Sequence, residues 1–321
     1  MTSLVSQLTV APTWLWLAFS IGILVLLLID LGIFGRTAHK VSRKAALVES
    51  GIWIAIALSF NAWFWFAFGS NLGLEFLTGY LVEKSLSVDN LFVILLIFGA
   101  FRIPNEYQHR VLFYGVLGAI ILRAFFIILG AQLLQSFHWI LYVFGGILVV
   151  TAVKFLFESD KKSDVRESWA VRVLRRVYPS TNSLSANRFF VIENGIRKAT
   201  PLLFALVAIE ITDLIFAVDS IPAVFAVTQD AFVAFASNIL AILGLRALYF
   251  VLADWVGRLR YLKPGLAAIL GFIGIKMLII DLVKIPSWVS LVVISSILTT
   301  AALTSWYVAS VEKRRTVEGL S

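Results

Sequence analysis

The 321-residue chain has no cysteine, and it has only three histidines and two methionines. Without cysteine it can form no disulfide, thiolate metal site or iron–sulfur cluster, and it has no thiol for redox catalysis. The few histidines and methionines also make a site for soft metals such as Cu⁺ a poor fit. Charged residues make up only 14% of the chain. These shortages leave oxygen as the main ligand atom for any chemistry.

Apolar residues, in contrast, are abundant. They make up 60% of the chain, and the mean hydropathy is +0.93, which is far too high for a soluble domain of this length. The net charge is +8, but the basic residues fall in short segments between apolar runs, which is typical of membrane topology and lipid headgroup contact. The sequence therefore predicts an all-α polytopic membrane protein that contacts the lipid bilayer and binds no nucleic acid.

Nine apolar segments are long enough to cross a hydrocarbon core of ~30 Å. Lys and Arg gather in alternate loops, whereas the intervening loops contain only Lys284. The positive-inside rule then predicts an N-terminus outside the cell and a C-terminus inside it. The predicted spans are Trp14–Phe34, Gly51–Gly69, Phe76–Phe101, Val111–Leu134, Trp139–Phe157, Pro201–Val227, Ala231–Val256, Pro264–Leu282 and Ser287–Val311.

An internal repeat lies on either side of the longest polar segment. In each half an acidic helix is followed by a helix with Leu-Arg-Ala (at Arg123 and Arg246) and then by a helix that ends in lysine (Lys154 and Lys276). Because each unit has three spans, consecutive units should face opposite ways, as in the inverted repeats of many secondary transporters. The expected divisions are two N-terminal helices in 1–75, a first repeat in 76–157, a cytoplasmic linker in 158–199, a second repeat in 200–284, and a ninth helix with a basic tail in 285–321. The linker could hold a short interfacial helix around Trp169–Val177.

Two acidic stretches, Glu83–Asn90 and Asp213–Ser220, occupy equivalent places in the two repeats. Each has two carboxylates six residues apart and ends in Val-Asp followed by a small polar residue. A charge at mid-membrane costs about 2.5–3.5 kcal/mol on insertion scales, so we expect these acids to have a function. Six residues of helix turn about 600° and rise ~9 Å, so neither pair can clamp one small ion on a straight helix. We therefore expect Asp89 and Asp219 to meet across the two repeats.

The remaining polar groups near these two aspartates supply a set of hard oxygen ligands. Pro222 frees the carbonyl of Val218 from the helical hydrogen-bond pattern, and Asn238 offers a further amide oxygen. Oxygen ligands suit Mn²⁺, Mg²⁺ or Ca²⁺. The predicted metal-binding residues are Asp89, Asp219, Glu83, Asp213, Glu210, Asn90, Ser220 and Val218.

The buried basic residues leave two interpretations open. Arg123, Arg246 and Lys84 could act as gating groups or counter-charges that occupy the acidic site when it is empty. Alternatively, the acids could serve only to hold helices together through salt bridges to these residues. Asp30, near the inner end of the first span, could be the ligand where an ion comes in, or it could be a solvated helix end.

Six stretches carry a resemblance to a known family. They are Gly79–Val93, Tyr114–Ile127, Phe189–Leu202, Glu210–Thr228, Ala236–Phe250 and Gly271–Asp281. In these stretches the chain resembles the TerC family of the LysE-like transporter superfamily, and in particular its Alx-type branch. The resemblance implies a bacterial inner-membrane protein of a family named for tellurium resistance, with members associated with manganese export and with supplying metal to exported proteins. The family's membrane acids fall on Glu83, Asp89, Glu210, Asp213 and Asp219.

The residues and the resemblance together predict a secondary transporter rather than an enzyme, with no permanently bound cofactor. It would export a divalent cation, with Mn²⁺ as the expected substrate, in exchange for protons, since the chain has no P-loop or phosphorylated-aspartate signature. One alternative is a membrane partner that hands metal to exported proteins or works with their translocation machinery. Others are a redox or tellurium-stress modulator without carrier activity, and an intramembrane aspartate enzyme, although the chain lacks Gly-x-Gly-Asp and His-Glu-x-x-His.

Overall fold

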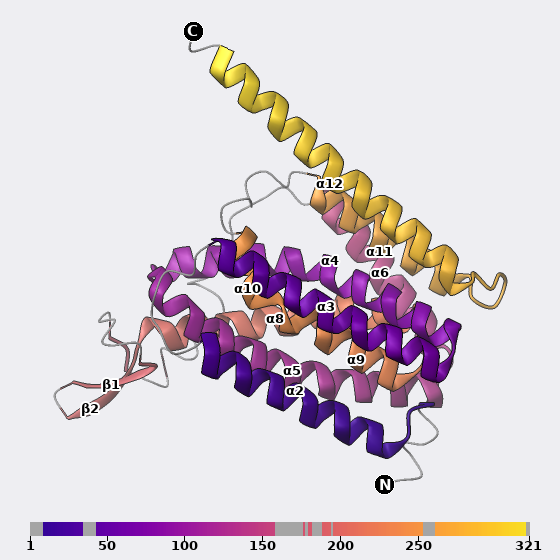
Figure 1. The fold of residues 1–321 in the computed structure, drawn as a ribbon, viewed down its shortest axis with the longest axis horizontal. Coiled ribbons are helices and arrows are strands. Elements are labelled where there is room, and N and C mark those ends of the chain that lie inside the picture. Colours follow the sequence, from indigo (N-terminus) through magenta and orange to yellow (C-terminus); the bar gives the residue numbers. More distant parts are fainter. Residues whose placement is uncertain are drawn as a thin grey trace.

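The computed structural model describes residues 9–34, 43–157, 176, 179–181, 188–193, 195–252 and 261–318. Long helices run side by side and make up most of this part of the chain (Figure 1). The elements are α2 (Thr13–Phe34), α3 (Arg43–Phe68), α4 (Ser70–Phe101), α5 (Asn105–Ser136), α6 (Ile140–Phe157), β1 (Phe190–Glu193), β2 (Ile196–Ala199), α8 (Pro201–Phe225), α9 (Ala231–Leu243), α10 (Leu245–Leu252), α11 (Leu262–Leu278) and α12 (Ser287–Glu318).

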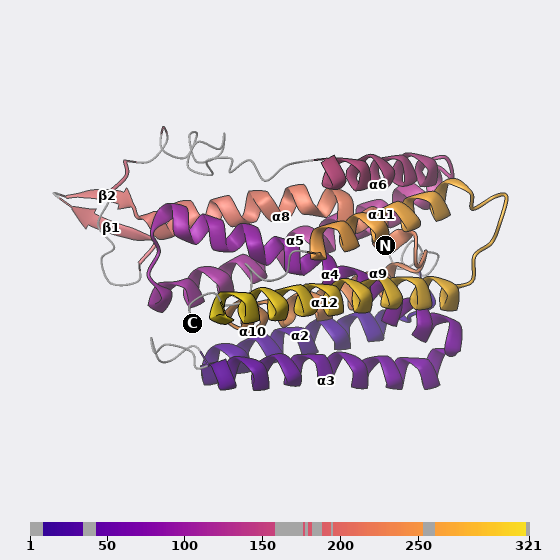
Figure 2. The same ribbon diagram turned by 90° about the horizontal axis from the view of Figure 1, so that it is seen from above.

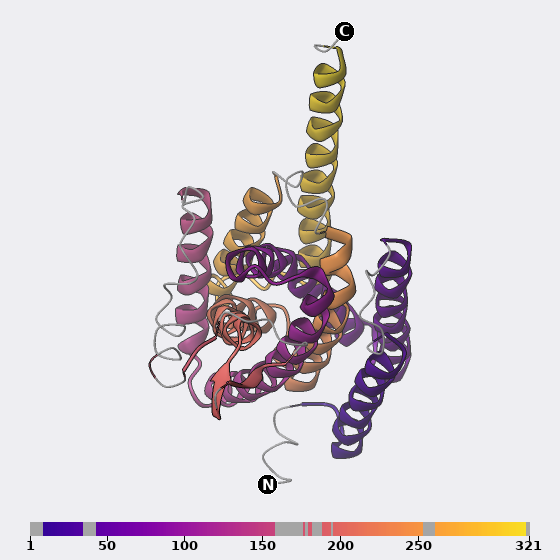
Figure 3. The same ribbon diagram turned by 90° about the vertical axis from the view of Figure 1, so that its left-hand side faces the viewer.

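The helices form layers around a central group. In Figure 2, α6 and α11 lie on one side, α2 and α3 on the other, and α4, α5, α8 and α9 between them. Viewed along the helices, α8 lies in the middle of the bundle (Figure 3). The strands β1 and β2 extend from one end of the bundle, which we call the hairpin end. Helix α12 packs on α4 and α11 and then leaves the bundle at an angle.

The apolar composition explains why helices dominate, because a helix satisfies its own backbone hydrogen bonds where no water is available. Seven described helical segments are long and apolar enough to cross a membrane. The predicted spans 76–101 and 264–282 are not among the seven. Helix α4, which contains the first of them, carries four charged residues, and α11, which contains the second, has 17 residues. The seven are Thr13–Asp30, Lys44–Phe68, Asn105–Ser136, Ile140–Phe157, Pro201–Phe225, Ala231–Val251 and Ser287–Val308.

The structure corrects two details of the sequence-based prediction and adds one element to it. The predicted span 231–256 is not one helix, because it is interrupted at Gly244 between α9 and α10. Helix α11 ends at Leu278 rather than Leu282. The predicted all-α multi-pass class is confirmed, and within the predicted linker the structure adds one short antiparallel pair, β1 and β2, with Gly195 at a φ of 76° in the turn. Apart from Arg176, the interfacial helix predicted at 169–177 lies outside the described residues.

Helix packing follows a reciprocal pattern. Helix α4 packs on α9 and α8, and α5 packs on α8 and α9. The third helices of the two predicted units, α6 and α11, pack on each other, and two glycines permit their close approach. A Cβ on Gly145 would lie 3.0 Å from the Gly274 carbonyl oxygen, and a Cβ on Gly274 would lie 2.9 Å from the Gly145 carbonyl oxygen. Small residues allow such backbone approach in membranes, where packing replaces the hydrophobic effect.

Polar contacts join the loops at the end of the bundle opposite the hairpin. Asp281 follows α11 and accepts hydrogen bonds from Tyr142 of α6 and from His138, which precedes α6. The hydrogen bonds from Tyr142 and His138 lower the pKa of the Asp281 carboxyl. Asp230 accepts hydrogen bonds from the backbone at the start of α9 and from Thr9. These contacts join the segment after α11 to α6, and the N-terminal segment to the start of α9.

Candidate functional site

Arg123 of α5 lies at the centre of the bundle and is fully buried. Its guanidinium forms ion pairs with Glu83 of α4 and with Asp213 of α8. Two of its nitrogens reach Asp213, with Nη2 to Oδ1 at 3.0 Å and Nε to Oδ2 at 3.4 Å. A guanidinium can hold a carboxylate in this bidentate way, which fixes orientation as well as charge. The first acids of both motifs therefore meet at one arginine.

Two neutral polar side chains complete what we call the Arg123 cluster. Asn238 of α9 donates a hydrogen bond from Nδ2 to Glu83 Oε2 at 2.9 Å. Nη1 of Arg123 lies 3.4 Å from both Asn238 Oδ1 and Ser220 Oγ. The cluster thus draws side chains from four helices, two from each predicted repeat unit: α4 and α5, and α8 and α9. Burying such charges is tolerable only because each is paired and hydrogen-bonded.

The second acids of the two motifs line one cavity beside this cluster. We call it the carboxylate cavity, and it is a partly open space with room for about one water molecule. Helix α4 contributes Leu86, Asp89 and Asn90, and α8 contributes Phe216, Asp219 and Ser220, so each helix supplies the same three motif positions. The other lining residues are Phe155 and Leu270. Thr151 of α6 donates a hydrogen bond to Asp219 Oδ1 at 2.7 Å. The predicted meeting of Asp89 and Asp219 around a common space is thus present.

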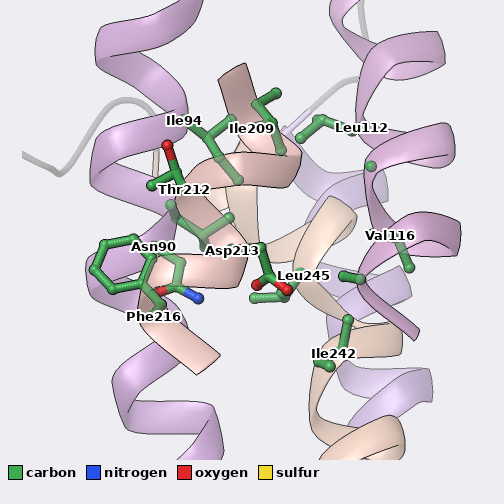
Figure 4. Close-up of a pocket in the computed structure, with 13 residues that line it drawn as sticks. Asn90, Ile94, Leu112, Val116, Ile209, Thr212, Asp213, Phe216, Ile242 and Leu245 are labelled. Atoms are coloured by element: carbon green, nitrogen blue, oxygen red, sulfur yellow. The ribbon is translucent and has the colours of Figure 1, made fainter. Parts of the chain in front are cut away.

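A larger cavity, with room for about two water molecules, lies on the hairpin side of the carboxylate cavity (Figure 4). Its walls are mostly apolar, so we call it the apolar cavity. Asp213 and Thr212 of α8 and Asn90 of α4 are its polar lining residues. Asn90 and Phe216 line both cavities and lie together at one edge of the space drawn in Figure 4. The other lining residues are Leu91, Ile94, Leu112, Gly115, Val116, Ala119, Ile209, Ile242 and Leu245.

Two predicted ligands lie elsewhere. Glu210 lies against Gly118 of α5, where its carboxylate fills the place of a side chain, and it lines neither cavity. The side chain of Val218 is 56% exposed on the surface of α8, and Pro222 lies within that helix as predicted. Their roles as metal ligands stay predictions. Among the described residues, no three acidic or histidine side chains gather closely enough to hold a metal ion by themselves.

Arg246 occupies a different environment from its counterpart Arg123. It forms ion pairs with Asp30 of α2 and Glu49 of α3, and all three side chains are buried. Asp30 is therefore not a solvated helix end, because its carboxylate is enclosed by neighbouring helices and paired. Lys84 donates a hydrogen bond at 3.1 Å to the Ala241 carbonyl, close to the interruption between α9 and α10. A positive charge is favourable there because carbonyls at a helix C-terminus carry partial negative charge.

Glu49 and Thr151 contact predicted site residues but were not predicted. Glu49 stood outside the predicted second span, which began at Gly51, whereas α3 begins at Arg43. If the second span had been predicted to begin at Arg43, Glu49 would have counted among the acids inside the membrane. Thr151 gives no local signal of its role, because a single threonine in a mostly apolar helix is common in membrane spans. Only the packing of α6 against α8 brings it to Asp219.

The fold and these buried charges define a multi-pass integral membrane protein with a polar centre. A family model described as "Integral membrane protein TerC family" matches residues 68–313. The chain therefore belongs to the TerC family of integral membrane proteins. No solved structure matches it.

The similar proteins are bacterial and match nearly the whole chain. An "Uncharacterized membrane protein STKORF319" of Myxococcus xanthus is 50% identical over 92% of this chain and 93% of its own length. A protein of Escherichia coli K12 named "Putative membrane-bound redox modulator Alx" is 46% identical over 96% of this chain and 99% of its own length. An "Uncharacterized membrane protein" of Rickettsia bellii is 42% identical over 88% and 94%.

Proposed function

We propose that this protein is a secondary transporter that exports a divalent cation, with Mn²⁺ as the expected substrate, across the bacterial inner membrane. The observation that carries the proposal is the carboxylate cavity, where Asp89 and Asp219 occupy the same motif position on two different helices. Two carboxylates, the Asn90 amide and the Ser220 hydroxyl form an all-oxygen ligand set. Such a set suits a hard divalent ion that keeps part of its water shell.

The reciprocal packing of the helices supports an inverted repeat around this cavity. Helix α4 packs on α9 as α8 packs on α5, and α6 crosses α11. If the two predicted units are exchanged, so that α4 takes the place of α8, α5 that of α9 and α6 that of α11, the same pairs of helices are in contact. Transporters with inverted repeats place their substrate site at the repeat interface near mid-membrane. The carboxylate cavity lies between α4 and α8, the first helices of the two predicted units, which agrees with such a placement.

The Arg123 cluster supports a carrier with internal charge compensation. Its guanidinium neutralises Glu83 and Asp213 beside the cavity, and it also lies 3.4 Å from Ser220, which lines the cavity. Arg123 can therefore balance the local negative charge when no metal is bound. Expelling a divalent ion from a negative interior costs roughly 4.6 kcal/mol per 100 mV, at about 2.3 kcal/mol per charge. Protons that enter and protonate the metal-binding carboxylates would supply this energy and release the metal.

Flux of ⁵⁴Mn²⁺ into proteoliposomes, with and without a pH gradient, tests the proposal. We expect Asp89→Asn and Asp219→Asn each to lower the flux at least tenfold, because each removes a charged ligand. Glu106→Gln is the control, since Glu106 is an exposed acid at the start of α5 that lines neither cavity, and it should leave the flux unchanged. Wild-type flux in both Asn variants would refute the site. Flux that ignores the pH gradient would refute proton exchange but not transport.

One alternative is suggested by the name of the Escherichia coli relative, which describes a redox modulator. This chain has no cysteine, so a thiol could not carry that chemistry. A membrane partner that supplies metal to exported proteins would use the same ligands without net transport. Purified protein that binds Mn²⁺ at Asp89 and Asp219 but gives no flux in proteoliposomes would favour that alternative.

A further inference from the structure

We infer that Phe216 is the gate between the apolar cavity and the carboxylate cavity. This inference builds on the proposed function because it names the side chain that controls access to the metal site. The two cavities have only Asn90 and Phe216 in common among their lining residues. A path from the hairpin end to Asp89 and Asp219 therefore passes these two side chains.

The spacing along α8 places Phe216 between the two acids of its motif. Asp213 lines the apolar cavity and Asp219 lines the carboxylate cavity. Phe216 is three residues from each, so all three side chains lie within roughly 60° steps around the helix, at successive levels of ~4.5 Å. An ion that moves from one carboxylate to the other must pass the aromatic ring. An apolar ring across a narrow path excludes water and thereby blocks a hydrated ion.

The Phe216 side chain is not enclosed by packing on every side. It borders the apolar cavity (Figure 4), and it is only half-buried. Rotation about the side-chain bonds can thus carry the ring out of the path while α8 stays in place. Asn90, the other shared residue, is buried and has a short side chain. Phe216 is therefore the movable part of the partition.

Leu86 occupies the matching position in the other motif, and its surroundings differ. It also lines the carboxylate cavity, but it packs in a core cluster with Leu141, Leu148 and Ala223. Displacing Leu86 would require α6 or α8 to move, because their side chains enclose it. The structure thus has one side of the metal site closed by a single ring and the opposite side closed by packed helices, an asymmetry that suits alternating access.

Cysteine accessibility tests the gate without any assumption about transport. The chain has no cysteine, so a single Ser220→Cys reports on the carboxylate cavity and a single Thr212→Cys on the apolar cavity. A small, charged methanethiosulfonate reagent is applied to purified protein in detergent. We expect Ser220→Cys to react at least tenfold faster when combined with Phe216→Ala. Thr212→Cys should react at the same rate with either residue at 216, and Phe125→Ala on the exposed face of α5 should change neither rate.

Equal labelling of Ser220→Cys with Phe or Ala at position 216 would overturn the gate. If Phe216→Ala does not yield folded protein, Phe216→Leu removes part of the ring and should give a smaller increase in the same direction. Transport separates the two proposals. Phe216→Ala should allow ⁵⁴Mn²⁺ to leak without a pH gradient, whereas Asp89→Asn should lower flux. Loss of flux in Asp89→Asn without a leak in Phe216→Ala would refute only the gate, and unchanged flux in Asp89→Asn would refute the metal site.

Discussion

At the scale of single residues, Arg123 has the largest expected effect on stability. It is fully buried and pairs with two carboxylates. Removing one partner from a buried ion pair leaves an uncompensated charge, at a cost of about 3–5 kcal/mol. We expect Arg123→Met to lower the unfolding temperature in detergent strongly, as measured by intrinsic fluorescence during heating.

The companion variant separates a charge effect from a packing effect. Replacing all three charged groups, with Arg123→Met, Glu83→Leu and Asp213→Leu together, removes both the desolvation cost and the attraction. Such replacements of buried ion pairs are often neutral, so the triple variant should recover most of the lost stability. A triple variant as unstable as Arg123→Met would show that the loss of stability comes from altered packing, and that the ion pairs contribute little.

At the scale of helices, the crossing of α6 and α11 makes a prediction with an internal control. A Cβ on Gly145 would lie 3.0 Å from the Gly274 carbonyl oxygen, the Leu278 side chain and the Met277 side chain, whereas a Cβ on Gly146 would meet nothing within 4 Å. Gly145→Ala should therefore separate the helices and lower the unfolding temperature. Gly146→Ala should leave it unchanged or raise it, since Ala favours helix over Gly by roughly 0.8–1.0 kcal/mol. Equal effects of the two changes would contradict this crossing.

The interruption at Gly244 makes a second prediction at this scale. A Cβ there would lie 2.9 Å from Lys84 Nζ and 3.1 Å from Trp53 Cβ. Gly244→Ala should displace the lysine from the Ala241 carbonyl and push α3 away from α9. We expect a lower unfolding temperature, whereas Gly22→Ala, at a helical site with open space, should have no such effect. If stability recovers in a Gly244→Ala/Lys84→Ala double variant, the destabilisation is caused by the contact with the lysine. If stability does not recover, it is caused by the contact with Trp53.

Comparison of individual helices shows what the sequence can predict. Long apolar runs define most spans, because a span needs only length and hydropathy. The two motifs also predicted that Asp89 and Asp219 share a cavity, since matched positions in a repeat indicate matched places. The interruption at Gly244 was not predicted, because a glycine inside an apolar run does not by itself mark the end of a helix. The partners of Arg246 were missed for another reason: Asp30 and Glu49 lie outside the repeat, and only tertiary packing brings them together.

At the scale of the whole molecule, side-chain contacts define two ends of the bundle, and the distribution of charge orients them. Helix α2 begins, and α5 and α11 end, at the end opposite the hairpin, as the contacts of Asp230 and Asp281 show. The distribution of Lys and Arg predicts that this end faces outward and that the hairpin end faces the cytoplasm. The direction of export depends on this assignment, because the gate at Phe216 lies on the hairpin side of the metal site.

Single cysteines in the cysteine-free chain test this orientation in intact cells. Lys284→Cys lies between α11 and α12, at the predicted outer end, and Asn105→Cys begins α5 at the predicted inner end. A membrane-impermeant maleimide should label Lys284→Cys in intact cells and Asn105→Cys only after the membrane is permeabilised. Labelling in the reverse order would show that the protein has the opposite orientation in the membrane. The Phe216 gate would then face outward, and the same cavities would describe a carrier whose metal site opens to the outside in this state.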